Sequence, residues 1–169
     1  MVEQGAVEQN VTEPVVVPEE HQFALGENGA VGEYVGFWKR LGATLIDFLI
    51  FGLVSFPLLY AVYGEDIFEP DRMVLGHFDF FVSYIAPAVV TIAFWRYGKA
   101  TPGKMAISAI IVDARTGGPV PLRRLIGRYF AYVLSALPLG LGFIWIAFDR
   151  RKQGWHDKLA NTVVIYEPI

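Results

Sequence analysis

The sequence predicts an all-α integral membrane protein, with three to four transmembrane or re-entrant helices and a small cytoplasmic β element. Hydrophobic residues make up 54% of the 169 residues and charged residues only 18%, a composition typical of membrane proteins. Residues 41–63 and 80–95 are two apolar segments, the second short but extendable. The length predicts one domain. The absence of cysteine excludes disulfides and thiolate metal sites.

The N-terminal part of the chain differs from the rest in charge. Residues 1–33 hold seven Glu and no Lys or Arg, whereas the remainder holds 14 Lys and Arg against ten Asp and Glu. An acidic segment without an apolar run cannot bury enough surface to offset the entropy lost on ordering. We therefore expect a disordered acidic cytoplasmic tail over residues 1–33 and a membrane domain over residues 34–166.

The first apolar segment, residues 41–63, is expected to cross the membrane as a helix. At ~1.5 Å per residue it is about 34 Å long, enough for a bilayer core of about 30 Å. Its one ionisable side chain, Asp47, costs roughly 2.5–3.5 kcal/mol to insert, which the surrounding Leu, Ile, Phe and Val outweigh. Asp47 must then face protein, water or a cation. Arg40 lies seven residues earlier on the same helix face, at the membrane border.

The distribution of positive charge predicts the orientation of the first two helices. Cations precede the first helix and follow the second, among them Arg40, Arg96 and Lys104. Residues 64–77, which connect the helices, hold four Asp and Glu against one Arg. The positive-inside rule therefore places the N-terminus and the loop after Arg96 in the cytoplasm. We expect a multi-pass protein of a bacterial-type inner or plasma membrane, with both termini cytoplasmic.

Two short segments in the C-terminal half favour β structure. Residues 107–114 are rich in β-branched side chains and are followed by Thr116-Gly117-Gly118, which suits a turn. Residues 162–166 are the expected partner strand. Extended loops with buried apolar side chains are the alternative, and the pattern does not separate the two.

Residues 121–149 pose a topological question. Residues 129–148 are long enough to cross once, but arginine and lysine flank both ends, so one crossing would break the charge rule. The run from Leu137 to Gly142 contains one Pro and two Gly. We therefore expect two helical pieces that meet at this break, with both basic ends cytoplasmic. A straight third span is the alternative.

Three groups of residues resemble the RDD family of membrane proteins, which is named for one Arg and two Asp. They are Gly36-Phe37-Trp38-Lys39-Arg40 with Asp47, then Gly98 with Thr101-Pro102-Gly103-Lys104, then the run from Gln153 to Val163 that contains His156-Asp157. The resemblance covers residues 34–166. It implies that the family Arg is Arg40 and the first Asp is Asp47. The second Asp is assigned to Asp157, with Asp149 as the less favoured candidate. The resemblance also implies transport of ions or other ligands.

Asp47 is the expected transport residue, with Arg40 and Asp157 as further functional residues. A carboxylate in low dielectric retains a proton unless a cation or hydrogen-bond donors favour its charged form, so it can exchange a proton for an ion. Arg96 or Arg128 is expected to approach Asp47, because Arg40 is too far along the same helix. The alternative is a structural ion pair or a helix-packing node.

Other polar groups have less specific interpretations. Lys104 ends an expected tight cytoplasmic turn, where its ammonium would reach the membrane surface or a lipid phosphate. Basic residues 150–152 suit anionic lipid or act only as a topology signal. His156 has no second His nearby, so no metal is expected. No motif indicates an enzyme, a cofactor or a nucleic-acid partner.

The sequence thus predicts a transporter of a cation, coupled to protons, or of a small solute. A membrane body of roughly 130 residues is small for a whole translocation path, so a homo-oligomer is expected. The alternative is a non-transporting assembly or adaptor protein whose acidic tail recruits a soluble partner.

Overall fold

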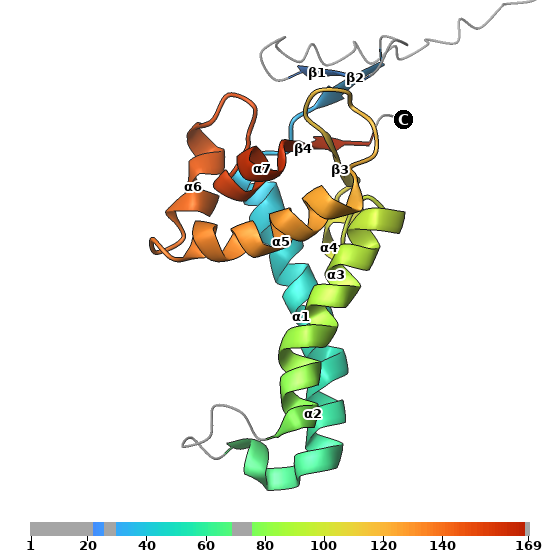
Figure 1. Ribbon diagram of the computed structural model, residues 1–169, viewed down its shortest axis with the longest axis vertical. Helices are drawn as coiled ribbons and strands as arrows, with labels where there is room; N and C mark the ends of the chain where they lie inside the picture. Colours follow the sequence, from blue (N-terminus) through green and yellow to red (C-terminus); the bar gives the residue numbers. More distant parts are fainter. Residues whose placement is uncertain (1–21, 26–29, 69–75, 168–169) are drawn as a thin grey trace, which may run out of the picture.

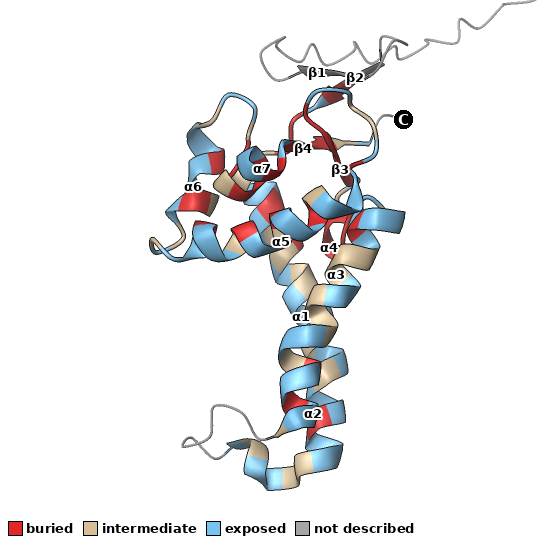
Figure 2. Cartoon of the chain, viewed as in Figure 1, coloured by how far each residue is buried: buried red, intermediate tan, exposed pale blue. Residues whose placement is uncertain are grey.

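The computed structural model describes residues 22–25, 30–68 and 76–167. A stalk of two long helices carries a head at one end, and the head contains the sheet, the shorter helices and the C-terminal part of the chain (Figure 1). The side chains of the stalk are mostly exposed, whereas buried residues gather in the head (Figure 2). An apolar stalk of this kind requires a non-aqueous surrounding.

The stalk contains the two helices that are long and apolar enough to cross a membrane. The first, Phe37–Phe68, comprises α1 (Phe37–Tyr63) and the 3₁₀ turn η2 (Gly64–Phe68). This helix begins at Phe37, four residues before the apolar run. Gly64, with φ of 57°, ends the α-helix in a conformation that favours glycine.

The second spanning helix, His77–Met105, changes its winding along its length. It comprises α2 (His77–Phe80), the π-helical turn η3 (Phe81–Ile85), α3 (Ala86–Tyr97) and α4 (Pro102–Met105). Pro87 lacks an N–H group and its ring crowds the carbonyl of the preceding turn. The wider π turn next to it relieves that conflict and lets the helix continue.

A two-stranded antiparallel sheet lies in the head, as the β-branched segments predicted. Strand β3 (Ala109–Asp113) pairs with β4 (Thr162–Tyr166), with Ile111 opposite Val164. The chain before α1 joins this sheet, because the backbone N–H of Val35 donates to the carbonyl of Val164 at 3.0 Å. The expectation of a small β element is confirmed, and the loop alternative is wrong.

The tail expected to be disordered contains strands in its described part. Strand β1 (Gln22–Leu25) pairs antiparallel with β2 (Ala30–Glu33), above the sheet of the head (Figure 1). A Cβ on Gly32 would lie 2.8 Å from Cδ1 of Ile165, so β2 packs closely against β4. The contact with β4 explains why residues 30–33 are ordered, and this contact cannot be predicted from composition. The rest of the expected tail, residues 1–21 and 26–29, lies outside the described residues.

The third apolar region is broken as expected. Helices α5 (Leu122–Ala136) and α6 (Leu141–Phe148) meet at an angle of 98°. Gly140 turns the chain with φ of 77°. The alternative of a straight third transmembrane helix is therefore wrong. The bent pair is either one broken transmembrane span or a re-entrant loop. Helix α5 lies across the top of the stalk, and α7 (Trp155–Ala160) packs on it (Figure 1).

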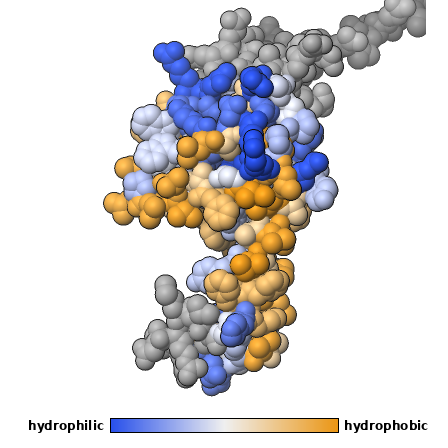
Figure 3. Space-filling view, viewed as in Figure 1, coloured by the Kyte–Doolittle hydropathy of each residue, from blue (hydrophilic) through white to orange (hydrophobic). Residues whose placement is uncertain are grey.

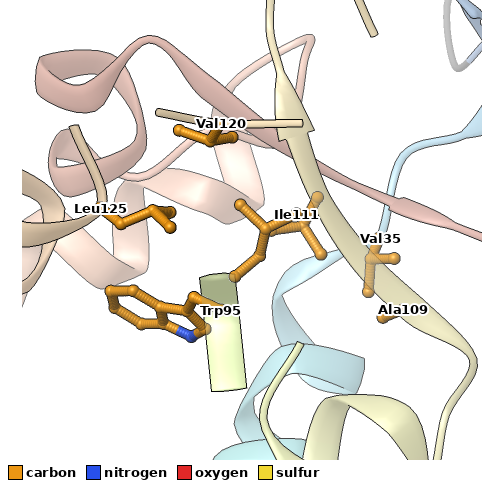
Figure 4. Packing of buried hydrophobic residues seen from close by; sticks show 7 residues of the cluster. Val35, Trp95, Ala109, Ile111, Val120 and Leu125 are labelled. Carbon is orange, nitrogen blue, oxygen red and sulfur yellow. The ribbon is translucent and has the colours of Figure 1, made fainter. Parts of the chain in front are cut away.

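The main core of the head combines the segment before α1, the second spanning helix, the sheet and α5. Val35, Trp95, Ile111 and Leu125 are among its buried members, and Figure 4 shows the ring of Trp95 below Leu125 and Ile111. Hydrophobic surface covers much of the stalk and the adjoining underside of the head, whereas the upper part of the head in this view is hydrophilic (Figure 3).

Candidate functional site

Asp157 is the centre of a fully buried ion-pair cluster. Nη1 of Arg40 donates to its Oδ2 at 2.5 Å, and Nη2 of Arg128 donates to its Oδ1 at 2.6 Å. The side chain of Asp157 is 0% exposed. Because it is the third residue of α7, it also accepts the backbone N–H of Gly154 at 3.1 Å and caps its own helix. One carboxylate therefore ties α1, α5 and α7 together.

The electrostatics of the cluster keep Asp157 charged. Burial by itself raises the pKa of a carboxyl group, but Arg128 and Arg40 outweigh that effect and hold the pKa of Asp157 well below its ordinary value. The neighbouring His156 behaves in the opposite way. Burial lowers its pKa to about 3, against the attraction of Asp157. At neutral pH the cluster therefore holds two cations, one anion and a neutral imidazole.

His156 is a packing residue in the head. Its Nδ1 lies 3.2 Å from Oγ of Ser135, and its ring meets the ring of Tyr132 edge to face, with centroids 4.4 Å apart. Ser135 also accepts the backbone N–H of His156 at 3.2 Å. Among the described residues no three His, Cys, Asp or Glu side chains are placed to hold a metal ion.

Asp47 lies in a separate site, where α4 docks on α1. Oγ1 of Thr101 donates to its Oδ2 at 2.5 Å, and the backbone N–H of Gly103 donates to its Oδ1 at 2.6 Å. Nζ of Lys104 lies 3.9 Å from Oδ2. The side chain of Asp47 is 23% exposed, so this carboxylate, unlike Asp157, is reachable from outside. The rest of its surface is covered by protein.

A close approach of two backbones builds this second site. A Cβ on Gly103 would lie 2.0 Å from the carbonyl oxygen of Ala43 and 2.9 Å from Cγ of Asp47. Only glycine fits at this position. The turn that was expected to reach the membrane surface instead folds back over α1 and encloses Asp47.

Three expectations about the polar residues are wrong. Neither Arg96 nor Arg128 is the partner of Asp47: Arg128 pairs with Asp157, and Arg96 is exposed, with its guanidinium 5.9 Å from the ring centre of Tyr97. Lys104 does not reach the membrane surface. It is buried, 6% exposed, because Asp47 and the hydroxyl of Thr101, 3.3 Å from its Nζ, satisfy its charge inside the protein.

Asp149 occupies a turn and not the buried cluster. Its Oδ2 accepts the backbone N–H groups of Arg151 and Gln153, each at 3.1 Å, and Lys158 forms an ion pair with its Oδ1. Asp157 therefore fits the role of the second motif aspartate, because it receives Arg40.

Sequence reasoning missed several polar partners. Thr101 and Gly103 belong to the motif but were assigned only to a turn. Their role as hydrogen-bond donors to Asp47 depends on how α4 packs on α1. Asp79 was missed as well. It is buried in the second spanning helix, and its Oδ1 accepts the hydroxyl of Ser83 at 2.8 Å. The spacing of four residues between Asp79 and Ser83 on one helix is the signal that could have found this pair.

The chain is similar to several bacterial proteins. It is 31% identical over 149 residues to the uncharacterized protein YxaI of Bacillus subtilis (strain 168), which covers 78% of this chain and 97% of YxaI. It is 27% identical over 145 residues to the uncharacterized membrane protein YteJ of the same organism, with 80% and 83% covered. The uncharacterized protein RP437 of Rickettsia prowazekii (strain Madrid E) is 43% identical over 74 residues, 44% of this chain and 40% of RP437. No solved structure matches the chain.

The model of the RDD family matches residues 34–161. That range contains both carboxylate sites and the arginine that joins α1 to α7. The chain therefore belongs to the RDD family and is a membrane protein with apolar helices.

Proposed function

We propose that the protein is a small membrane carrier that exchanges a proton for a cation, or moves a small solute, at Asp47. The observation that carries this proposal is the pairing of a partly exposed carboxylate on a spanning helix with a loosely held lysine. Nζ of Lys104 is 3.9 Å from Asp47, beyond hydrogen-bonding distance. The ammonium of Lys104 donates to Thr101 at 3.3 Å and is not hydrogen-bonded to the carboxylate, so a cation that enters this site competes with it for Asp47.

The proposed cycle uses Lys104 as an internal cation. At rest, Lys104 lies beside Asp47 as its counter-ion. An incoming cation replaces Lys104, and protonation of Asp47 then releases the cation. The two hydrogen bonds from Thr101 and Gly103 couple the charge of Asp47 to the position of α4, so occupancy of the site alters how α4 docks on α1.

The Asp157 cluster has a supporting role in this proposal. It holds Arg40 at the start of α1 and keeps the head fixed while α4 moves. Its carboxylate is fully buried and bonded to two arginines, so it is a poor exchange site.

The proposed location is the inner or plasma membrane, with the head in the cytoplasm. Lysine and arginine are concentrated at the head, and the opposite end of the stalk carries Glu65 and Asp66. The positive-inside rule then makes both termini cytoplasmic. Two spanning helices do not enclose a path by themselves, and their exposed surfaces suit a second copy of the chain. A homo-oligomer is therefore part of the proposal.

The test is cation flux into liposomes that contain the purified protein, driven by a pH gradient. Wild type and Asp47→Asn are compared for Na⁺, K⁺ and Li⁺, with Asp149→Asn as the matched control. We expect flux in wild type and in Asp149→Asn, and at least about a tenfold loss in Asp47→Asn, since the titrating group is gone. Flux that is absent for each ion, or unchanged in Asp47→Asn, contradicts the carrier.

The adaptor function has no observation in its favour among the described residues, because the acidic tail lies largely outside them. Removal of residues 1–21 separates the two functions. A carrier retains its flux after this deletion, whereas an adaptor loses its soluble partner.

A further inference from the structure

Buried hydrogen-bond donors without acceptors gather at one place in the head. Among the described residues, the buried side-chain nitrogen and oxygen atoms that lack a hydrogen-bond partner are Nη2 of Arg40, Nε and Nη1 of Arg128, and Nε1 of Trp95. All of them are N–H donors. The three residues are nearly inaccessible, with exposed fractions of 5%, 0% and 3%. Native proteins rarely leave such groups unpaired.

The three residues are neighbours. Arg40 and Arg128 hold the two oxygens of the same carboxylate, Asp157. The guanidinium carbon of Arg128 lies 4.8 Å from the ring centre of Trp95. The indole nitrogen of Trp95 lies on the side of its ring away from Val120 and Leu125 (Figure 4). The unpartnered donors therefore lie on three neighbouring side chains, one each from α1, α3 and α5.

This region also carries an excess of positive charge. Two guanidinium groups face one carboxylate, and His156 is neutral, with a pKa of about 3. The adjacent Lys104 and Asp47 cancel one another. The buried cluster thus has a net charge of one positive unit, and an uncompensated charge in a low-dielectric interior is strongly unfavourable.

We propose that this region binds a small monovalent inorganic anion of the size of chloride. An anion supplies the acceptor that the donors of Arg40, Arg128 and Trp95 lack, and it cancels the excess charge. The cation–π contact with Trp95 offsets part of the charge of Arg128. It gives no acceptor to Nε1 of Trp95 or Nη2 of Arg40. This site is separate from Asp47 and does not depend on the proposed transport.

The test measures the thermal unfolding of the full-length protein in detergent at constant ionic strength, while sodium chloride replaces sodium gluconate. Gluconate is too large for a buried site. We expect the unfolding temperature of wild type to rise with chloride and to saturate, since a ligand that binds only the folded state stabilises it. Sodium bromide should act in the same way.

Two variants assign the effect to this site. Trp95→Phe keeps the ring contact with Arg128 but removes Nε1, so the apparent chloride affinity should fall about tenfold, as expected for one lost hydrogen bond to a charged group. Arg96→Gln removes an exposed arginine next to Trp95 and should leave the chloride response unchanged.

Equal stability in chloride and gluconate would overturn the proposal, because water alone would then serve the donors. An identical chloride response in wild type and Trp95→Phe would also overturn it. If Trp95→Phe does not fold, equilibrium dialysis of wild type with radioactive chloride decides: one bound ion per chain supports the site, and none rejects it. Neither measurement involves flux, so failure here leaves the carrier proposal standing.

Discussion

Arg40 donates to Asp157, 117 positions later in the chain, at 2.5 Å. It does not pair with Asp47, which lies on the same helix seven residues away. The side chain of Arg40 points back toward the start of α1, where its Nε also donates to the carbonyl of Val35 at 3.0 Å. The arginine and the two aspartates of the motif therefore form two sites, one fully buried around Asp157 and one partly exposed at Asp47.

Loss of the Asp157 carboxylate should destabilise the protein severely. In Asp157→Asn, Arg40 and Arg128 remain buried without their counter-ion, and breaking such a pair costs about 3–5 kcal/mol. Chemical unfolding in mild detergent measures the change in the free energy of unfolding. Glu65→Gln, at an exposed position, is the control and should differ from wild type by less than about 0.5 kcal/mol. A similarly small effect of Asp157→Asn would show that the cluster does not hold the head.

Acid should destabilise the protein in two stages. The pKa of His156 falls from 6.5 to about 3 on folding, so below pH 6.5 the unfolded chain binds a proton that the folded chain does not. That part of the stability is complete above pH 6.5 and is lost as the pH falls toward 3. Folding also lowers the pKa of Asp157 from 3.8, so its contribution is complete above that value and is lost only below it.

The variant His156→Gln should therefore remove the first stage and keep the second. Unfolding temperatures measured from pH 8 to pH 4 check the loss of the first stage, with His77→Gln, an exposed histidine, as the control. Wild type and His77→Gln should lose stability from about pH 6.5 downward. Curves of the same shape for wild type and His156→Gln would contradict the burial of a neutral imidazole.

The contact between α4 and α1 should not tolerate a methyl group. In Gly103→Ala the new Cβ would lie 2.0 Å from a backbone oxygen, that of Ala43. The backbone must shift, at a cost of about 1–3 kcal/mol, and the hydrogen bond from residue 103 to Asp47 is lost. Thermal unfolding and flux measure the two effects.

Gly127→Ala is the matched control for this change. It lies inside α5, and nothing is within 4 Å of the added Cβ, so it should be neutral or should stabilise by up to about 1 kcal/mol. Gly103→Ala with unaltered stability and flux would mean that α4 does not dock on Asp47.

The bent pair α5–α6 should dip into the cytoplasmic leaflet without crossing. Leu139 at the bend is 95% exposed, and the hydrophobic underside of the head continues into the surface of the stalk (Figure 3). Since the chain lacks cysteine, single cysteines can be labelled with a membrane-impermeant reagent. Leu139→Cys should resist labelling from both sides, whereas Arg115→Cys labels from the cytoplasm and Glu65→Cys from outside. Labelling of Leu139→Cys from outside would indicate a full crossing.

Much of the fold follows from local pattern. The apolar run around Asp47 predicts α1, the β-branched residues near Ile111 predict β3, and Pro138 with its glycines predicts the break between α5 and α6. The strand pairing at 30–33 does not follow from composition, because its stability comes from contact with β4. The tail boundary at residue 33 stays a prediction.

The sites were harder to predict than the helices. Resemblance to the family selected Arg40, Asp47 and Asp157, but partner choice depends on how segments meet in space. Arg128 is 29 residues from Asp157, and only the packing of α5 on α7 brings them together. Lys104 was expected at the membrane surface because an isolated lysine prefers water. The enclosed carboxylate reverses that preference.

The central claim is that the carboxylate of residue 47 is the group that exchanges a proton for a cation. The most direct measurement is pH-gradient-driven cation flux per reconstituted chain for wild type, Asp47→Glu and Asp47→Asn, each verified as folded. We expect flux in wild type, partial flux in Asp47→Glu, which keeps a titratable group, and none in Asp47→Asn. Equal flux in wild type and folded Asp47→Asn would contradict the claim.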